Sequence, residues 1–322
     1  MKNLLRIVGV SLTLAFSVVA AAAQSYPSRP VKIIVPFAPG GPADIFARQL
    51  GQYMSEDLKQ SFVIEDRPGA GSILGTEAVA KAAPDGYTLL AMSNTHTTNE
   101  WLIPNKPYQL MRDFVAVAPI NYSDLLMVVP PSVPAKNLAE FIALAKSKPG
   151  KLNYASSGPG TPYHMAGELF KAMSGTDIVH VPYKGSGEAR NAVIGAHVDM
   201  MFDAITTMAP IARAAQVRAL GTTGVKRSSV LPEVPTIAEA GVPGYEATIW
   251  LGLMAPAGTP QPIVDKLNAE VVKIISRADL QKKWADQGAV SMIMSPAEFD
   301  KYLRADIAKW AHVVEVSGAK VE

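Results

Sequence analysis

The sequence predicts an α/β protein of two lobes, each a mostly parallel sheet flanked by helices. Short runs rich in β-branched residues, of which 31–35 is the first, alternate with segments whose apolar residues have helical spacing. The order of strand, glycine-rich turn and helix occurs near the start of the chain and again from residue 152. At 322 residues the chain is long enough for two such lobes.

The first strand–turn–helix unit contains a candidate anion site. Residues 31–35 form the strand and Pro39-Gly40-Gly41 the turn, and Pro42 suits the first position of a helix. Apolar residues then recur at every fourth position, at Phe46, Leu50, Met54 and Leu58. Backbone N–H groups and the positive end of the helix dipole meet at such a turn, which favours an anion. A tight turn without a ligand stays open as the alternative.

The N-terminus is typical of a secretory signal peptide at residues 1–23. Lys2 and Arg6 precede an apolar stretch at 7–19, and Ala21 and Ala23 fit the small-residue pattern of a cleavage site near Ala23. The alternative is an uncleaved membrane anchor, but the apolar run is short for a span. No later apolar run is free of proline, glycine or charge, so none is a transmembrane candidate.

The charge balance and the lack of cysteine narrow the class of protein. Removal of residues 1–23 removes two of the 30 basic residues and none of the 28 acidic ones, which leaves a neutral mature chain. A neutral chain argues against nucleic acid and anionic membranes as partners. The absence of cysteine excludes disulfides, thiolate metal sites and a cysteine nucleophile. An exported protein without disulfides fits the bacterial periplasm.

The rest of the first lobe is expected to place polar residues at the same sheet edge as the first turn. Strands are expected at 61–65, 87–92, 114–120 and 125–129, with a helix at 73–83. The glycines that open this helix miss the dinucleotide-binding spacing by one residue. Residues 93–98 are expected to form a polar loop at the carboxyl end of the third strand, where ligands bind in parallel sheets. Ser93 and Thr95 are therefore candidate ligand contacts.

The second copy of the unit starts with a strand at 152–155. Its turn, Ser156-Ser157-Gly158-Pro159-Gly160-Thr161-Pro162, precedes a helix at 163–173. A strand at 178–181 leads to a loop at 182–187 that carries Tyr183 and Lys184. The other expected elements are helices at 137–147 and 188–195, strands at 198–202 and 217–222, and one short helix within 232–243. The strand at 198–202 ends at Asp203.

The C-terminal part is expected to return to the first lobe. A strand at 250–254 precedes three helices, at 261–276, 279–287 and 296–316. This helical tail needs a sheet to pack on, and the first lobe is short of cover on one face. We therefore expect lobe 1 at 26–128 plus 250–322 and lobe 2 at 129–249. Two crossings between the lobes predict a hinge and a ligand cleft.

Sequence patterns of catalysis and metal binding are nearly absent. The chain has no Gly-x-Ser-x-Gly, Walker-type or His-Glu-x-x-His motif. His164 and Glu168 have the spacing of a metal clamp, but an ordinary helix contact is the alternative. Ser157 with His164 lacks a third orienting group. Asp44 and Asp203 are expected near the cleft, yet a carboxylate pair alone is a weak sign of an enzyme.

The two turns are expected to face each other across the cleft. Ser157, Gly158, Gly160 and Thr161 offer hydroxyls and N–H groups at a helix start, opposite the first turn. Two such cradles without a basic side chain suit a small dicarboxylate. Lys184 is the one cation expected nearby, with a solvated loop lysine as the alternative.

The motifs resemble those of the Bug proteins, the TctC-like periplasmic receptors of tripartite tricarboxylate transporters. The resemblance covers nearly all of the mature chain and is carried by several segments in order. These are Tyr26-Pro-Ser-Arg-Pro30, Val35-Pro-Phe-Ala-Pro-Gly-Gly-Pro-Ala-Asp44, Arg67-Pro-Gly-Ala-Gly71, Pro84-Asp-Gly-Tyr-Thr-Leu89, Tyr154-Ala-Ser-Ser-Gly158, Val181-Pro-Tyr-Lys-Gly185, Leu231-Pro-Glu-Val-Pro-Thr236 and Ala255-Pro-Ala-Gly-Thr-Pro260.

The resemblance implies a two-lobed Venus-flytrap receptor that delivers carboxylates to a membrane permease. It implies that the 39–41 turn holds one carboxylate, through waters, and the 156–161 turn the other, with Asp44 and Asp203 organising loops and waters. The residues expected to contact the ligand are Phe37, Ala38, Pro39, Gly40, Gly41, Asp44, Ser93, Thr95, Ser156, Ser157, Gly158, Thr161, His164, Tyr183 and Asp203. No cofactor, metal or catalytic residue is expected, and the protein is expected to be a monomer.

The substrate is left open by the motifs of the family. Phe37, Tyr163, His164 and Trp250 lie on or beside the proposed loops and could form flat walls for an aromatic ring. The chain also resembles the terephthalate-binding members of the family, so an aromatic dicarboxylate is the expected ligand. The alternatives are an aliphatic di- or tricarboxylate, an acidic amino acid, an exported enzyme acting on a carboxylate, and a receptor that signals to a membrane kinase.

Overall fold

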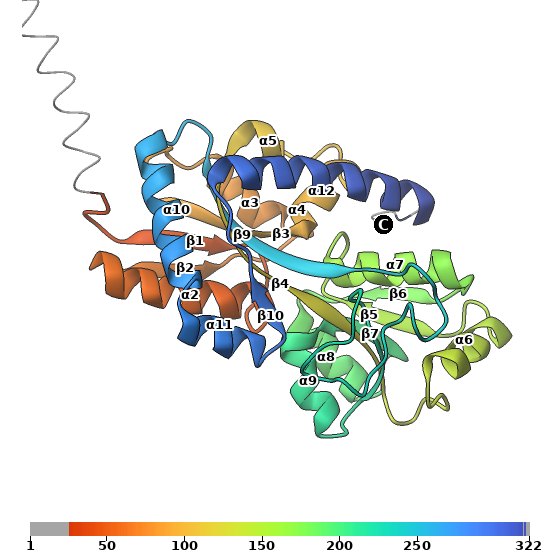
Figure 1. Ribbon diagram of the computed structural model, residues 1–322. Helices are drawn as coiled ribbons and strands as arrows, with labels where there is room; N and C mark the ends of the chain where they lie inside the picture. The colour runs from red at the N-terminus through yellow and green to blue at the C-terminus, as the bar shows by residue number, and fades with distance from the viewer. Residues whose placement is uncertain (1–25, 318, 320–322) are drawn as a thin grey trace, which may run out of the picture.

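Two α/β lobes share one long strand, β4 (Phe114–Val129) (Figure 1). The computed structural model describes residues 26–317 and 319, so the expected signal peptide at 1–23 lies outside the described residues. The sheet of lobe 1 contains β1 (Val31–Val35), β2 (Phe62–Asp66), β3 (Thr88–Ser93), β9 (Thr248–Pro256), β10 (Ala289–Ser291) and the start of β4. The sheet of lobe 2 contains the end of β4, β5 (Asn153–Ser156), β6 (Val179–Pro182), β7 (Met200–Ala204) and β8 (Arg218–Thr222).

The predicted fold class is confirmed, with sheets that are mixed. β1 pairs in parallel with β2 and β3, and β5 pairs in parallel with β6 and β7. The pairs made by β4 and β9 are antiparallel, because these strands carry the chain between the lobes and back. The expected boundary between the lobes at 128/129 stays a prediction. In the structure β4 changes its pairing partner four residues earlier, where Asp124 pairs with β9 and Leu125 with β7.

β4 was expected as two strands, at 114–120 and 125–129, and this was wrong. The polar stretch between them, from Asn121 to Asp124, pairs with β9 on one side and partly with β10 on the other. Both edges of the backbone are therefore hydrogen-bonded by segments distant in sequence, so the strand continues. Two register shifts, near Val117 and Ile120, absorb the irregularity.

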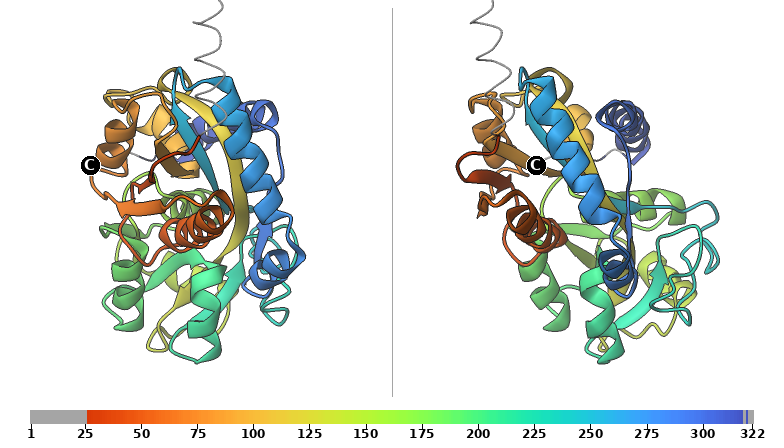
Figure 2. Two further views of the ribbon diagram at one scale, coloured as in Figure 1. Left: turned by 90° about the vertical axis from the view of Figure 1, so that its left-hand side faces the viewer. Right: turned by 60° about the vertical axis from the view of Figure 1, so that its left-hand side comes forward.

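In lobe 1, helices cover both faces of the sheet, and the period-2 alternation of the strands decides which residue faces which layer. Ile33 packs into the core under α2 (Pro42–Leu58) and α10 (Gln261–Ile275). Ile34 faces the opposite core, under α3 (Ile73–Ala80) and α12 (Pro296–Ser317). Figure 2 shows α2 and α10 on one side of the sheet. The remaining helices of lobe 1 are α4 (Asn94–Leu102), α5 (Leu110–Asp113) and α11 (Ala278–Ala285).

Lobe 2 is layered in the same way. α6 (Leu138–Ser147) and α7 (Pro162–Ser174) share a core with one face of its sheet, and α8 (Ser186–Ile194) and α9 (Ile205–Arg213) share a core with the other. α12 also reaches α7 of this lobe, where Trp310 and Met165 share a small cluster (Figure 1). The short helix expected within 232–243 is absent from the described chain, which forms turns there. Across residues 26–317 and 319, no helix combines the length and the apolar character that a membrane span requires.

Candidate anion site between the lobes

Four helix starts converge on one cavity between the lobes, which we call the inner cavity. α2 and α4 come from lobe 1, and α7 and α8 come from lobe 2. The described residues that line it are Phe37, Ala38, Gly41, Pro42, Ala43, Ser93, Thr95, Ser157, Thr161, Pro162, Tyr163, Gly185, Ser186, Ile249 and Leu251. The first backbone N–H groups of a helix have no partner within the helix, and its dipole is positive at that end. A convergence of helix starts of this kind favours an anion.

The start of α2 is shaped by the glycine turn that precedes it. Gly40 has φ +82°, a conformation that favours glycine, and its N–H donates to Asp44 Oδ2 at 2.9 Å. Asp44 also pairs with Arg48, which in turn pairs with Asp66 at 2.5 Å. Asp44 thus fixes the turn through the Gly40 amide. Gly41 and Ala43 line the inner cavity, whereas Pro39 and Gly40 do not.

The start of α4 was expected to be a polar loop at 93–98, and this was wrong. Ser93 caps a helix that begins at Asn94, with its Oγ accepting the Thr95 N–H at 3.2 Å. The buried Thr97 and Thr98 hydroxyls donate to the Asn94 carbonyl, both at 2.9 Å. These buried polar residues can form a helix because most of their polar groups find partners, and Asn94 Nδ2 donates to the distant Thr248 carbonyl at 2.9 Å. Ser93 and Thr95 both line the cavity, which agrees with their expected place at the carboxyl end of the third strand.

The start of α7 is formed by the 156–161 turn of lobe 2. Thr161 is the N-cap of α7, and its Oγ1 also donates to the Gly158 carbonyl at 2.7 Å. Gly158 and Gly160 have φ values of +117° and +73°, so both turn positions favour glycine. Pro162 occupies the first helical position. The hydroxyl-bearing residues of this turn that line the cavity are Ser157 and Thr161.

The start of α8 was missed by sequence reasoning, which began this helix two residues late. Gly185 is its N-cap without a side-chain cap, and Ser186 is its first residue. A β-carbon added to Gly41 would lie 2.9 Å from Ser186 Oγ, so α8 rather than α7 makes the closest approach to the first turn. The signal was present in the sequence, since Gly185 follows a strand and precedes a helix as Gly41 does.

No charged residue is among the described lining of the inner cavity. A buried ion pair joins Arg190 Nε and Asp203 Oδ2 at 2.7 Å, and both charges act on the cavity-lining Tyr163. Burial raises the pKa of Asp203, and Arg190 opposes this rise. Asp203 also accepts the Ala204 N–H at 2.9 Å and the Thr207 hydroxyl at 3.2 Å. Its oxygens are thus engaged within lobe 2.

A wider opening, which we call the mouth groove, continues from the inner cavity through Phe37, Ser157 and Thr161. Gly158, Tyr183 and Lys184 line it on lobe 2, and the 68–73 loop lines it on lobe 1. The space open to the centre of a water-sized sphere is about 30 Å³ in the inner cavity and about 1010 Å³ in the groove. One water needs roughly 10–15 Å³. The lobes must therefore separate before an acid can enter the inner cavity.

The fifteen residues predicted to contact a ligand fall into three groups. Those that line the inner cavity are Phe37, Ala38, Gly41, Ser93, Thr95, Ser157 and Thr161. Those that line only the mouth groove are Gly158 and Tyr183. Those that line neither are Pro39 and Gly40, which are exposed, and Asp44, Ser156, His164 and Asp203, which are buried. Of the four aromatic side chains considered as flat walls, Tyr163 and Phe37 line the cavity, whereas Trp250 is buried against Phe299 and Tyr302.

His164 and Glu168, whose spacing suggested a metal clamp, contact different partners. Glu168 accepts the Tyr154 hydroxyl at 2.7 Å and pairs with Lys171 at 2.8 Å. His164 Nδ1 accepts the Gly160 N–H at 3.1 Å. Within the described residues, no group of three or more histidine, aspartate or glutamate side chains is arranged to hold a metal.

Two α/β lobes with a cavity between them, lined by helix starts and no charged side chain among the described residues, are typical of a solute-binding receptor. The chain belongs to the tripartite tricarboxylate transporter receptor family (TctC), whose family model matches residues 46–319. Protein BugT of Bordetella pertussis is 35% identical over 324 residues, covering 100% of this chain and 99% of its own length. Members of this family are periplasmic substrate-binding receptors for carboxylates and not enzymes.

Two solved structures share the fold closely. R. palustris Rpa4515 with adipate superposes with a TM-score of 0.89 at 35% identity, covering 92% of this chain and 100% of its own. MatC from Rhodopseudomonas palustris with bound malate superposes with a TM-score of 0.85 at 36% identity, covering 90% and 100%. Both likenesses extend over the two lobes.

Proposed function

We propose that this chain is the periplasmic receptor for a dicarboxylate with an apolar middle, and that terephthalate is its substrate. The observation that carries the proposal is the composition of the inner cavity, with helix starts and hydroxyls as its polar groups and apolar side chains between them. Phe37 and Tyr163 supply aromatic faces, and Ile249 and Leu251 supply aliphatic ones. A flat acid with two ionised ends matches this alternation.

Each end of the acid meets helix starts from both lobes. One carboxylate lies at the starts of α2 and α8, where Ala43 and Ser186 carry first-turn N–H groups. The other lies at the starts of α4 and α7, near the hydroxyls of Thr95, Ser157 and Thr161. Each contact between a charge and a helix start contributes roughly 0.3–1 kcal/mol when exposed and up to about 2 kcal/mol when partly buried. Closure of the lobes is therefore part of binding.

A second candidate substrate is an aliphatic dicarboxylate. The support for it is that Rpa4515, at 35% identity, was solved with adipate. An aliphatic chain of similar length fits between the same polar ends, but it gains less from the faces of Phe37 and Tyr163.

With either acid bound, the receptor delivers it to the membrane subunits of a tripartite tricarboxylate transporter. The receptor acts as a monomer after export.

The test is a thermal-shift and calorimetry panel with terephthalate, adipate, malate, citrate and glutamate. A ligand present at 100 times its Kd stabilises the folded state by about 2.7 kcal/mol, which raises the Tm of a chain of this size by about 5–10 °C. We expect terephthalate to give the largest shift. A larger shift with adipate selects the second candidate, and a response to citrate or glutamate alone overturns both. Mass spectrometry of the incubated ligand should show no conversion.

A further inference from the structure

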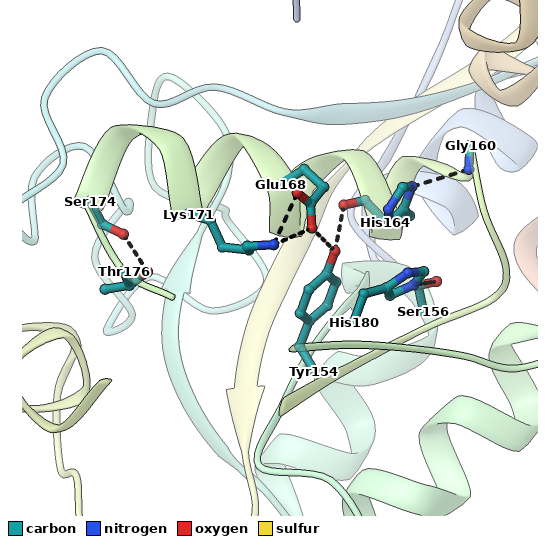
Figure 3. A network of polar contacts seen from close by, with 9 residues as sticks. All are labelled: Tyr154, Ser156, Gly160, His164, Glu168, Lys171, Ser174, Thr176 and His180. Carbon is teal, nitrogen blue, oxygen red and sulfur yellow. Dashed lines mark hydrogen bonds and ion pairs between the residues drawn. The ribbon is translucent and has the colours of Figure 1, made fainter. Parts of the chain in front are cut away.

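Three stacked rings lie behind the lobe 2 turn, and the proposed function does not use them. The rings of Tyr154 and His180 stack with centroids 4.9 Å apart, and those of His180 and His164 stack at 4.1 Å (Figure 3). Tyr154 and His164 are buried, and His180 is partly buried. None of the three rings lines the inner cavity or the mouth groove.

Each imidazole holds one end of the turn. His164 Nδ1 accepts the Gly160 N–H at 3.1 Å, and His180 Nε2 lies 2.6 Å from Ser156 Oγ (Figure 3). Ser156 Oγ in turn accepts the Gly158 N–H at 3.1 Å. The amides of Gly158 and Gly160 are thus occupied from behind, although a glycine turn could have offered them to an anion.

The stack is fixed at its other end by a charged group. The Tyr154 hydroxyl donates to Glu168 Oε1 at 2.7 Å, and Lys171 Nζ donates to the same carboxylate at 2.8 and 3.1 Å (Figure 3). Glu168, Lys171 and His164 lie on α7, whereas Tyr154 and His180 lie on β5 and β6. The network therefore ties the turn to the helix that follows it and to two strands of its sheet.

We propose that His164 and His180 are positioning residues that hold the 156–161 turn in its anion-binding form. They do so without touching the acid, by engaging the Gly160 amide and the Ser156 hydroxyl. The turn then presents Ser157, Thr161 and the first-turn N–H of Tyr163 to the ligand. This inference rests on the proposed function for its effect on affinity, but its structural part concerns the turn alone.

The chemistry requires a neutral His164. A backbone N–H only donates, so Nδ1 of His164 carries a lone pair and its proton is on Nε2. Burial lowers the pKa of His164 to about 4, with a smaller contribution from the charge of Lys171. Burial also lowers the pKa of His180 to about 3, and the adjacent His164 acts in the same direction. The charge of Glu168 raises the pKa of His180 but does not reverse its lowering by burial.

Paired substitutions separate the hydrogen bond from packing. In His164→Asn the side-chain amide oxygen is attached to Cγ, as Nδ1 is, and keeps an acceptor for Gly160, whereas His164→Leu removes it. His180→Gln and His180→Leu form the same pair for Ser156. His197→Leu, at an exposed histidine, is the matched control. The readouts are amide hydrogen exchange of Gly158 and Gly160 by NMR without ligand, and affinity for the best acid of the panel.

We expect the Leu variants to accelerate exchange at their own glycine and to weaken binding about ten-fold, with the Asn and Gln variants within about three-fold of wild type. The control should match wild type in both readouts. Unchanged exchange and affinity in the Leu variants would overturn the inference, as would equal losses in the Leu and polar variants. If wild type binds no acid of the panel, the proposed function fails, while the exchange of the two glycines still decides the role of the histidines.

Discussion

Gly185 of lobe 2 faces Ala38 of lobe 1 so closely that a β-carbon on Gly185 would lie 2.6 Å from the Ala38 β-carbon. The φ of Gly185 is −171°, an extended conformation open to any residue, so the need for glycine is steric. The contact lies beside the inner cavity, since both residues line it. The two lobes are therefore in close contact here, and a methyl group added at Gly185 would clash with Ala38 and disfavour this arrangement.

The first prediction is that Gly185→Ala weakens binding by holding the lobes apart. Forcing an extra carbon into a packed contact costs about 1–3 kcal/mol, which corresponds to a rise in Kd of about 5- to 150-fold. Gly187→Ala is the matched control, because a β-carbon there would meet only the Pro39 carbonyl at 3.8 Å. Calorimetry and small-angle scattering should show weaker binding and less compaction for Gly185→Ala alone. Equal affinity in the two variants would contradict closure at this contact.

The second prediction separates the two hydroxyls of the lobe 2 turn. Ser157→Ala should weaken binding about ten-fold and leave the Tm of the unliganded protein unchanged, because its hydroxyl serves the ligand. Thr161→Ala should also lower the Tm by about 2–4 °C, since Thr161 caps α7 and its loss costs about 1 kcal/mol. Denaturation curves and calorimetry on both variants and the double variant test this. Losses of stability that match the losses of affinity in all three would show a structural role only.

The third prediction concerns the backbone of the first turn. Gly40→Val places a branched side chain at φ +82° and should cost about 1–2 kcal/mol of stability, with the fold intact and binding weakened. Gly244→Val is matched to it, because Gly244 has φ +79° and, like Gly40, has nothing within 4 Å of an added β-carbon. Both variants should unfold at similarly reduced denaturant concentrations. Only Gly40→Val should lose affinity, and a similar loss in Gly244→Val would refute a local role for the turn.

The fourth prediction follows from two buried histidines, His96 and His164, and the partly buried His180. Burial lowers the pKa of His96 and of His164 to about 4, and that of His180 to about 3. The unfolded chain binds these protons near pH 6.5, so their contribution to stability is complete above that pH and is lost as the pH falls towards 4. In NMR titrations the ring signals of these residues should stay unchanged from pH 8 to pH 5. A midpoint near 6.5 for any of them would contradict its burial as a neutral ring.

Local patterns were enough to predict most of the strands and helices of each lobe, but not α4, α5, α9 or β10. The spacing of Phe46, Leu50 and Met54 predicted α2, and those side chains are buried as expected. The glycine turns and Pro42 and Pro162 marked two of the four helix starts in the inner cavity. These features depend on residues adjacent in sequence, which is why they can be predicted from it.

The features that were missed depend on long-range contacts. β4 is continuous because β9 and β10, more than 100 residues later, pair with its polar stretch. α4 forms where contacts distant in sequence partner its buried polar side chains, since Asn94 Nδ2 donates to the Thr248 carbonyl at 2.9 Å and Thr97 Oγ1 lies 2.5 Å from Asp306 Oδ2. The stack of His164 on His180 joins α7 to β6. No spacing rule places these residues together.

The most direct test of the central claim is a crystal structure of the protein with the best-binding acid of the panel. We predict one carboxylate within hydrogen-bonding distance, directly or through one water, of the starts of α2 and α8, and the other beside Ser157 and Thr161. We also predict no lysine or arginine in contact with either. An acid bound in the mouth groove against Lys184, with the inner cavity unchanged, would contradict the central claim.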